Sequence, residues 1–260
     1  MSRPPAAEPS EAVVRDAIAT IARRYPEVRA VIAHGSWVRG GDFWPGQSDL
    51  DLIVATAPET PREIELRIQS EWKILLSRTL HLDVEPFVLT EGDLEAWRMA
   101  RSIKPAFQTM AVQLDIAGFE VVDRHILLWS LTGRDPLAGF PVLRGAHLQD
   151  EAVARVRQLL EYDFVRWGDE QANRIACDAL KAATLFFLVK AGRPPTRDKG
   201  EVFQLFLTVV PDFPHRRETA DRIWELYRAG NTAGGPQHRK ACHEFVRELL
   251  NLVDPALVST

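Results

Sequence analysis

The chain has 260 residues, of which 46% are apolar and 26% are charged, and its formal net charge is −4. This length suffices for one large domain or two modest ones, each with its own core. A net negative chain lacks the bulk attraction to phosphate that drives non-specific nucleic-acid binding, so strong binding to DNA or RNA is not expected. The two cysteines lie far apart and without metal-ligand spacing. They predict neither a zinc site nor a disulfide framework, and they favour a reducing, cytoplasmic location.

The first elements are a polar tail and a helix. Residues 1–10 are rich in Pro, Ala and Ser and contain no apolar core of a signal peptide, so we expect a disordered tail. A helix follows up to Arg24, with apolar residues at helical spacing. Because no apolar run reaches eighteen residues, no membrane span is expected.

Two aspartates separated by one leucine carry the clearest chemical signal. Asp49-Leu50-Asp51-Leu52 opens an apolar run, and the alternation of a strand puts both carboxylates on one face and both leucines in the core. Two carboxylates about 4 Å apart repel by roughly 4 kcal/mol at an effective dielectric near 20, so the pair needs a counter-charge. A divalent cation would supply it.

Twelve residues separate a glycine-serine pair, which reads as a turn, from the first of these aspartates. A predicted strand within residues 25–33 leads into Gly35 and Ser36, and a short segment ending at Arg39 follows. Glycine lets the backbone approach a phosphate closely, and the serine hydroxyl can donate to its oxygens. We therefore expect Ser36 to hold phosphates that an aspartate-bound metal bridges. Phe43 and Trp44, in the loop over residues 40–47, either stack on a base or cover the core, and the second reading is preferred.

A third carboxylate is expected from the next strand. Residues 61–78 read as a helix, and residues 80–85 then alternate between apolar and polar side chains. Asp83 and Glu85 share the polar face with His81, and Asp83 is the preferred third carboxylate. Pro86 predicts a bend or a sheet edge, because proline removes a ladder donor. A helix is predicted from Thr90 to Met99.

Together these residues resemble the DNA polymerase β-like nucleotidyltransferase superfamily. Its signature begins with an apolar residue, a glycine and then a second glycine or a serine, and after a gap it continues with Asp-apolar-Asp-apolar. Gly35, Ser36, Asp49 and Asp51 match this signature. His34 stands where an apolar or aromatic residue is usual. The form of residues 35–40 looks like that of the aminoglycoside nucleotidyltransferases. The resemblance implies a magnesium-dependent enzyme that uses ATP or another nucleoside triphosphate, and a role in antibiotic resistance.

The same resemblance implies roles for individual residues. Two Mg²⁺ ions would be held by Asp49, Asp51 and Asp83. Asp83 or Glu85 would be catalytic and accept the proton of the attacking hydroxyl. The predicted nucleotide-binding residues are Gly35, Ser36, Arg39, Lys181, Arg197 and Lys199.

The C-terminal half is predicted to be helical. Residues 101–146 are broken by Gly and Pro around a possible strand at 119–122, and the domain boundary is placed near 125–145. Predicted helices cover residues 147–167, 173–191, 199–210, 215–229 and 236–253. This half resembles the helical domains of kanamycin nucleotidyltransferase and HEPN proteins, in which basic residues such as Lys181, Arg197 and Lys199 would contact the triphosphate, although solvated lysines are the simpler reading.

The resulting prediction is an α+β fold, with a disordered tail at 1–10, a nucleotidyltransferase domain at 11–135 built on a small mixed sheet with flanking helices, and an α-helical bundle domain at 136–260. The predicted reaction transfers a nucleoside monophosphate, with AMP from ATP preferred, to a hydroxyl of a small molecule such as an aminoglycoside, and releases pyrophosphate. A protein or tRNA hydroxyl as acceptor, a catalytically inactive nucleotide-binding module and a helical interaction protein are the alternatives. Homodimerisation is left open.

Overall fold

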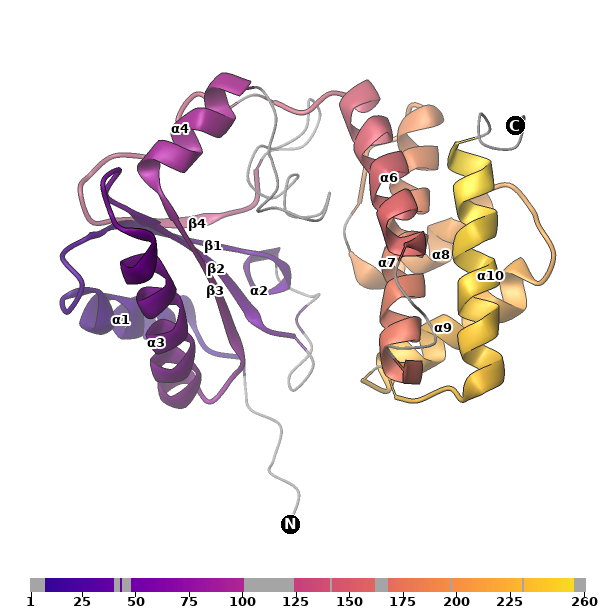
Figure 1. Cartoon of the computed structure of the whole chain (residues 1–260), viewed down its shortest axis with the longest axis horizontal. Coiled ribbons are helices and arrows are strands. Elements are labelled where there is room, and N and C mark those ends of the chain that lie inside the picture. Colours follow the sequence, from indigo (N-terminus) through magenta and orange to yellow (C-terminus); the bar gives the residue numbers. More distant parts are fainter. Residues whose placement is uncertain are drawn as a thin grey trace, which may run out of the picture. The chain divides into compact units, whose positions relative to one another are not determined.

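The computed structural model describes residues 8–39, 43, 48–100, 124–140, 142–161, 168–196, 198–230 and 232–254. The chain divides into two compact units, Met1–Val142 and Leu143–Thr260. Figure 1 shows a sheet with helices in the first unit and helices alone in the second. This confirms the predicted α+β fold class.

The first unit is built around a four-stranded mixed sheet with strand order β3-β2-β1-β4. β1 is antiparallel to β2 and to β4, whereas β2 and β3 are parallel. The elements in chain order are α1 (Glu11–Ala22), β1 (Val28–His34), α2 (Ser36–Arg39), β2 (Leu50–Thr56), α3 (Arg62–Leu80), β3 (Val84–Thr90), α4 (Glu91–Ala100) and β4 (Leu127–Ser130).

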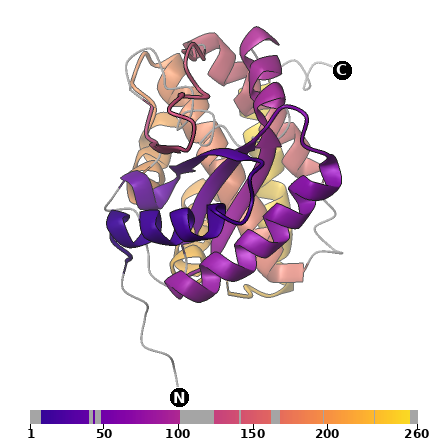
Figure 2. The same cartoon turned by 90° about the vertical axis from the view of Figure 1, so that its left-hand side faces the viewer.

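The helices α1 and α3 cover one face of this sheet (Figure 2). Leu50, Leu52 and Val54 of β2 point to this face and join one apolar cluster with Ile18 of α1 and Trp72 of α3. Since side chains alternate along a strand, the residues between them, Asp51 included, point to the opposite face. The predicted inward direction of the two leucines is confirmed.

The third strand lies further along the chain than predicted. Residues 80–85 were expected to form it, but Leu80 is the buried last residue of α3, and β3 begins at Val84. The apolar positions Leu76 and Leu80 continue the helical stripe of α3. The apparent alternation was therefore the end of a helix followed by a turn, in which His81 has a φ of 55°.

β3 is nonetheless an edge strand, as Pro86 predicted. The N–H of Leu50 donates to the carbonyl of Asp83 at 2.9 Å, which sets the parallel ladder. In that ladder alternate residues of β3 bond to β2, so the nitrogen of Pro86 faces the open edge and no ladder bond is lost.

The short strand β4 was not predicted. It pairs Trp129 with Val31 of β1 at the other edge of the sheet. Its four residues sit among Gly and Pro residues, which hid the strand pattern. The strand expected at 119–122 lies outside the described residues.

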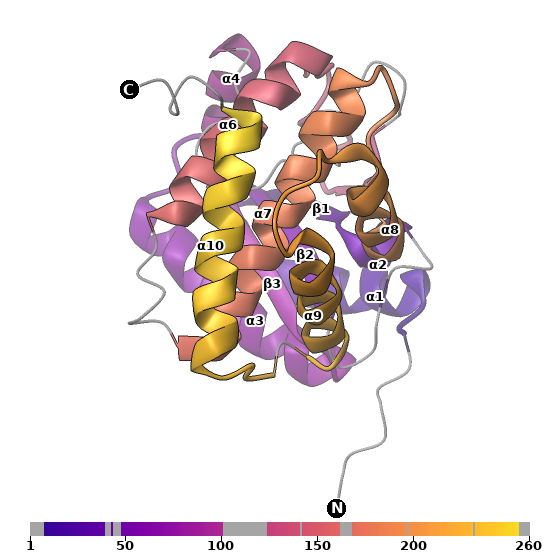
Figure 3. The same ribbon diagram turned by 90° about the vertical axis from the view of Figure 1, so that its right-hand side faces the viewer.

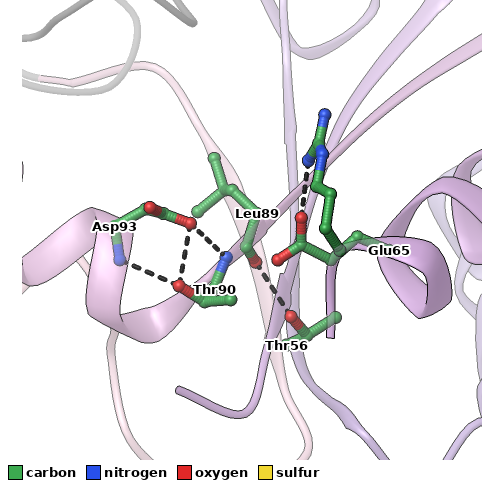
Figure 4. A network of polar contacts seen from close by, with 6 residues as sticks. Thr56, Glu65, Leu89, Thr90 and Asp93 are labelled. Atoms are coloured by element: carbon green, nitrogen blue, oxygen red, sulfur yellow. Dashed lines mark hydrogen bonds and ion pairs between the residues drawn. The ribbon is translucent and has the colours of Figure 1, made fainter. Parts of the chain in front are cut away.

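A network of hydrogen bonds lies at the C-terminal ends of β2 and β3 (Figure 4). The hydroxyl of Thr56 donates to the carbonyl of Leu89 at 3.2 Å. The Asp93 carboxylate accepts the N–H of Thr90 at 2.9 Å, and the Thr90 hydroxyl accepts the N–H of Asp93 at 3.0 Å. This reciprocal pair caps the start of α4. Nearby, the buried Glu65 is paired with an arginine one turn away on α3.

The second unit is a bundle of five helices among the described residues, in agreement with the predicted helical half. They are α6 (Gly145–Leu160), α7 (Gly168–Lys190), α8 (Lys199–Val209), α9 (Arg216–Arg228) and α10 (Pro236–Val253). The long α7 contacts the other four and carries much of the apolar core. Figure 3 shows α10 lying alongside α6 and α7. None of the described helices is long and apolar enough to cross a membrane.

Candidate active site

The glycine-serine turn lies directly against the second aspartate. β1 ends at His34, and Gly35 follows with a φ of +81°, a conformation that L side chains rarely adopt. A β-carbon placed on Gly35 would lie 2.1 Å from Oδ2 of Asp51. Only glycine therefore leaves room for this carboxylate. Strand pairing contributes to the approach, because His34 and Asp51 are register partners across β1 and β2.

Both aspartates are partly exposed at the start of β2. Asp49 precedes the strand and Asp51 is its second residue, while Leu50 and Leu52 are 0% and 1% exposed. The buried leucines fix the orientation of the strand, since a slip by one residue would move both of them out of the core. The expected common face of Asp49 and Asp51 follows from this alternation.

Both candidates for the third carboxylate lie beside β2, at different positions. Glu85 is the register partner of Asp51, and neighbouring strands are about 4.8 Å apart. Asp83 comes just before β3 and lies beside Asp49, because its carbonyl accepts the N–H of Leu50. Both side chains are exposed. Register thus favours Glu85 as the partner of Asp51, whereas the sequence favoured Asp83.

Lys73 of α3 lies among these acids, which the sequence did not indicate. Its ammonium donates to Glu85, with Nζ 2.9 Å from Oε1. The hydrogen bond that Lys73 donates to Glu85 raises the pKa of Lys73, burial opposes the rise, and the charges of Glu85, Asp83 and Asp49 add to it. The influence of all three carboxylates on one ammonium indicates that they gather at the same end of the sheet. No sequence pattern links Lys73 to them, because the contact depends on how α3 packs along β3.

The acids fit magnesium, although they do not enclose an ion. Within the described part of the chain, no three His, Cys, Asp or Glu side chains gather closely enough to hold a metal. Mg²⁺, however, is usually bound by one or two carboxylates together with substrate phosphates and water. Asp49 and Asp51 supply oxygen ligands of that kind, and the missing side chain of Gly35 leaves room for the Asp51 carboxylate. The donor set therefore suits a magnesium ion that is also bound by a nucleotide.

The predicted nucleotide-binding residues of the first unit lie around the same turn. Ser36 is buried, with 5% of its surface exposed, at the start of α2. Arg39 ends this short helix, and its N–H donates to the carbonyl of Gly35 at 3.3 Å. His34, also buried, precedes the turn. Phe43 belongs to the apolar core, as preferred from the sequence, and Trp44 lies outside the described residues.

The predicted basic residues of the second unit have contacts within that unit. Lys181 on α7 lies 3.4 Å from Oδ1 of Asp178 and 5.1 Å from the ring centroid of Tyr227. Burial lowers the pKa of Lys181, but nearby Cys177, Asp178 and Tyr227 more than offset this and raise it. Lys199 is the first residue of α8, after the N-cap Asp198. Arg197 lies outside the described residues.

Comparison with known proteins identifies a structural neighbour. Neither a protein-family model nor a curated protein sequence matches the chain. Its structure is similar to the crystal structure of the spectinomycin adenyltransferase AAD(9) from Enterococcus faecialis, which was solved with ATP and spectinomycin. The TM-score is 0.57 at 12% identity, and the match covers 94% of this chain and 99% of that chain. This likeness shows the fold. The chain thus shares the fold of this adenyltransferase.

Proposed function

We propose that the protein is a magnesium-dependent nucleotidyltransferase that transfers a nucleoside monophosphate, with AMP from ATP as the first choice, to a hydroxyl of a small molecule such as an aminoglycoside. The observation that carries this proposal is the approach of Asp51 to Gly35, where a β-carbon would lie 2.1 Å from the carboxylate. This close approach brings the glycine-serine turn and the aspartate pair of the motif next to each other. The similarity in fold to an adenyltransferase supports the same reaction class.

The metal ligands in this proposal are Asp49 and Asp51. When bound, the magnesium ions would neutralise the triphosphate and polarise the reacting oxygens. The two carboxylates are oriented by the buried leucines between and after them. Ser36 and Arg39 are proposed to donate to phosphate oxygens from the adjoining turn and short helix.

Glu85 is proposed to accept the proton of the acceptor hydroxyl. The hydroxyl oxygen attacks the α-phosphorus in line, the bond from that phosphorus to the bridging oxygen breaks, and pyrophosphate leaves with the bonding pair. Glu85 is preferred over Asp83 because it pairs in register with Asp51, whereas Asp83 lies one step earlier, beside Asp49. Asp83 remains the alternative as base or as metal ligand.

The nature of the acceptor rests on charge. The chain carries a formal net charge of −4, and Asp49, Asp83 and Glu85 lie near one another, so a cationic acceptor would be attracted electrostatically. An aminoglycoside has both the positive charge and the hydroxyl groups. The assignments of Lys181, Arg197 and Lys199 as triphosphate contacts, and of residues 11–135 and 136–260 as two domains, stay predictions.

The deciding experiment measures release of pyrophosphate from ATP and Mg²⁺ across a panel of aminoglycosides, tRNA and proteins. We expect turnover with an aminoglycoside, metal-dependent ATP binding, and weaker binding in Asp49→Asn. Asp16→Asn is the matched control, because Asp16 is an exposed aspartate on α1. Metal-dependent ATP binding without turnover of any acceptor would favour an inactive nucleotide-binding module. The absence of ATP binding would refute the proposal.

A second pair of variants separates the two candidate bases. Loss of a general base lowers the rate by about 10²–10⁴-fold, so Glu85→Gln should reduce kcat by that order while leaving KM for ATP nearly unchanged. Asp83→Asn should have the smaller effect on kcat. The reverse order would assign the base to Asp83.

A further inference from the structure

Lys73 is held at the open edge of β3 by the packing of α3. Lys73 and Ser77 are four residues apart and therefore lie on the same face of the helix. The Ser77 hydroxyl accepts the N–H of Val84 at 3.1 Å, and the Lys73 ammonium donates to Glu85. These two contacts hold α3 beside the start of β3, so Lys73 reaches Glu85 while the backbone of both elements stays where it is.

The Lys73 ammonium contacts both oxygens of the Glu85 carboxylate. A cation held by Asp49 and Asp51 must therefore compete with Lys73 for the electrostatic attraction of the Glu85 carboxylate. A divalent ion has the advantage, since it carries twice the charge and would also interact with Asp49 and Asp51. The ion pair itself is weak, because the side chains of Lys73 and Glu85 are 53% and 54% exposed to water.

We propose that Lys73 is a positioning residue that holds Glu85 at the edge of β3 until a magnesium–nucleotide complex binds beside Asp51, and then releases it. The inference rests on the proposed function. It explains why metal and nucleotide would bind first: Glu85 becomes free to accept a proton only once both are in place. Lys73 takes no part in the bond changes.

Removal of Lys73 should make the metal easier to bind. An exposed ion pair changes an equilibrium by about 2- to 5-fold, so Lys73→Met should lower by that factor the Mg²⁺ concentration for half-maximal nucleotide binding. Lys73→Arg keeps the charge and should stay close to the original protein. Lys240→Met is the matched control, since Lys240 is an exposed lysine 3.9 Å from a glutamate in the second unit.

The experiment titrates the full chain with Mg²⁺ in the presence of a fluorescent ATP analogue that has a methylene group between the α and β phosphorus atoms. Anisotropy reports binding, and no turnover occurs. The same series in a Glu85→Gln background tests the mechanism. If Lys73 acts through Glu85, Lys73→Met should no longer shift the midpoint there, whereas a general effect of charge would persist.

The outcomes separate this inference from the proposed function. An unchanged midpoint in Lys73→Met, or an equal shift in the Glu85→Gln background, overturns the role of Lys73 while the magnesium-dependent binding stands. If the original protein shows no magnesium-dependent binding, or if Asp51→Asn leaves it unaffected, the proposed function fails and the inference with it. Circular dichroism of each variant checks that the fold is retained.

Discussion

Replacement of Gly35 by alanine would test whether the turn and Asp51 form one site. Two costs are expected. An alanine at a φ of +81° is strained by about 1–2 kcal/mol. Its β-carbon would also lie 2.1 Å from Oδ2 of Asp51, while ordinary contact begins at 3.4 Å, so the carboxylate must retreat by 3.4 − 2.1 = 1.3 Å.

The displacement of Asp51 should affect function more than stability. We expect the free energy of unfolding to fall by about 2–3 kcal/mol. This sum contains the backbone strain and the part of the clash that movement of the carboxylate does not relieve. A misplacement of about 1 Å can cost roughly 100-fold in rate, so turnover and magnesium-dependent ATP binding should both drop steeply. Urea denaturation followed by fluorescence measures the first effect, and binding and pyrophosphate assays measure the second.

Two further variants separate strain from collision. Gly133 has a φ of +76° with no atom within 4 Å of an added β-carbon, so Gly133→Ala should cost only the strain and leave ATP binding intact. In an Asp51→Ala background, Gly35→Ala should lose its extra cost in stability, because the carboxylate is gone. If Gly35→Ala and Gly133→Ala behave alike in stability and binding, the close contact has no functional meaning.

Three other predictions concern the fold. Thr90→Ala removes the cap of α4 and should lower the free energy of unfolding by about 1 kcal/mol in urea titrations, and an unchanged midpoint would contradict the capping role. Burial, aided by a hydrogen bond to Glu71 and by its charge, raises the pKa of Tyr25 to about 12. The folded protein thus binds this proton more tightly than the unfolded chain, whose tyrosine pKa is about 10, and stability should fall as pH rises from 10 to 12. Tyr25→Phe should flatten that fall, whereas an identical pH profile would argue against the shift. Burial raises the pKa of Cys177 to about 11, so a thiol reagent at pH 8 should label it only after unfolding in guanidinium, and fast labelling of the native protein would refute this.

The sequence by itself determined the parts of the site that are close along the chain. Side chains alternate along a strand, so the period of two in Asp49-Leu50-Asp51-Leu52 was enough to predict that the leucines are buried and the aspartates point the other way. The antiparallel pairing of β1 with β2 then brings the glycine-serine turn to Asp51. The helical stripes of the second half likewise predicted its helices, because the apolar face of an amphipathic helix is written in its spacing.

Only the tertiary structure placed the two candidates for the third carboxylate beside these aspartates. α3 separates β2 from β3. Leu80 fits both the helical stripe of α3 and the alternation of residues 80–85, and the structure assigns it to the helix and begins the strand at Val84. The parallel register then sets Glu85 beside Asp51 and Asp83 beside Asp49. Register between strands that are distant in sequence, and the contact of Lys73 with Glu85, depend on how a helix packs along a sheet edge, and local spacing carries no information about that packing.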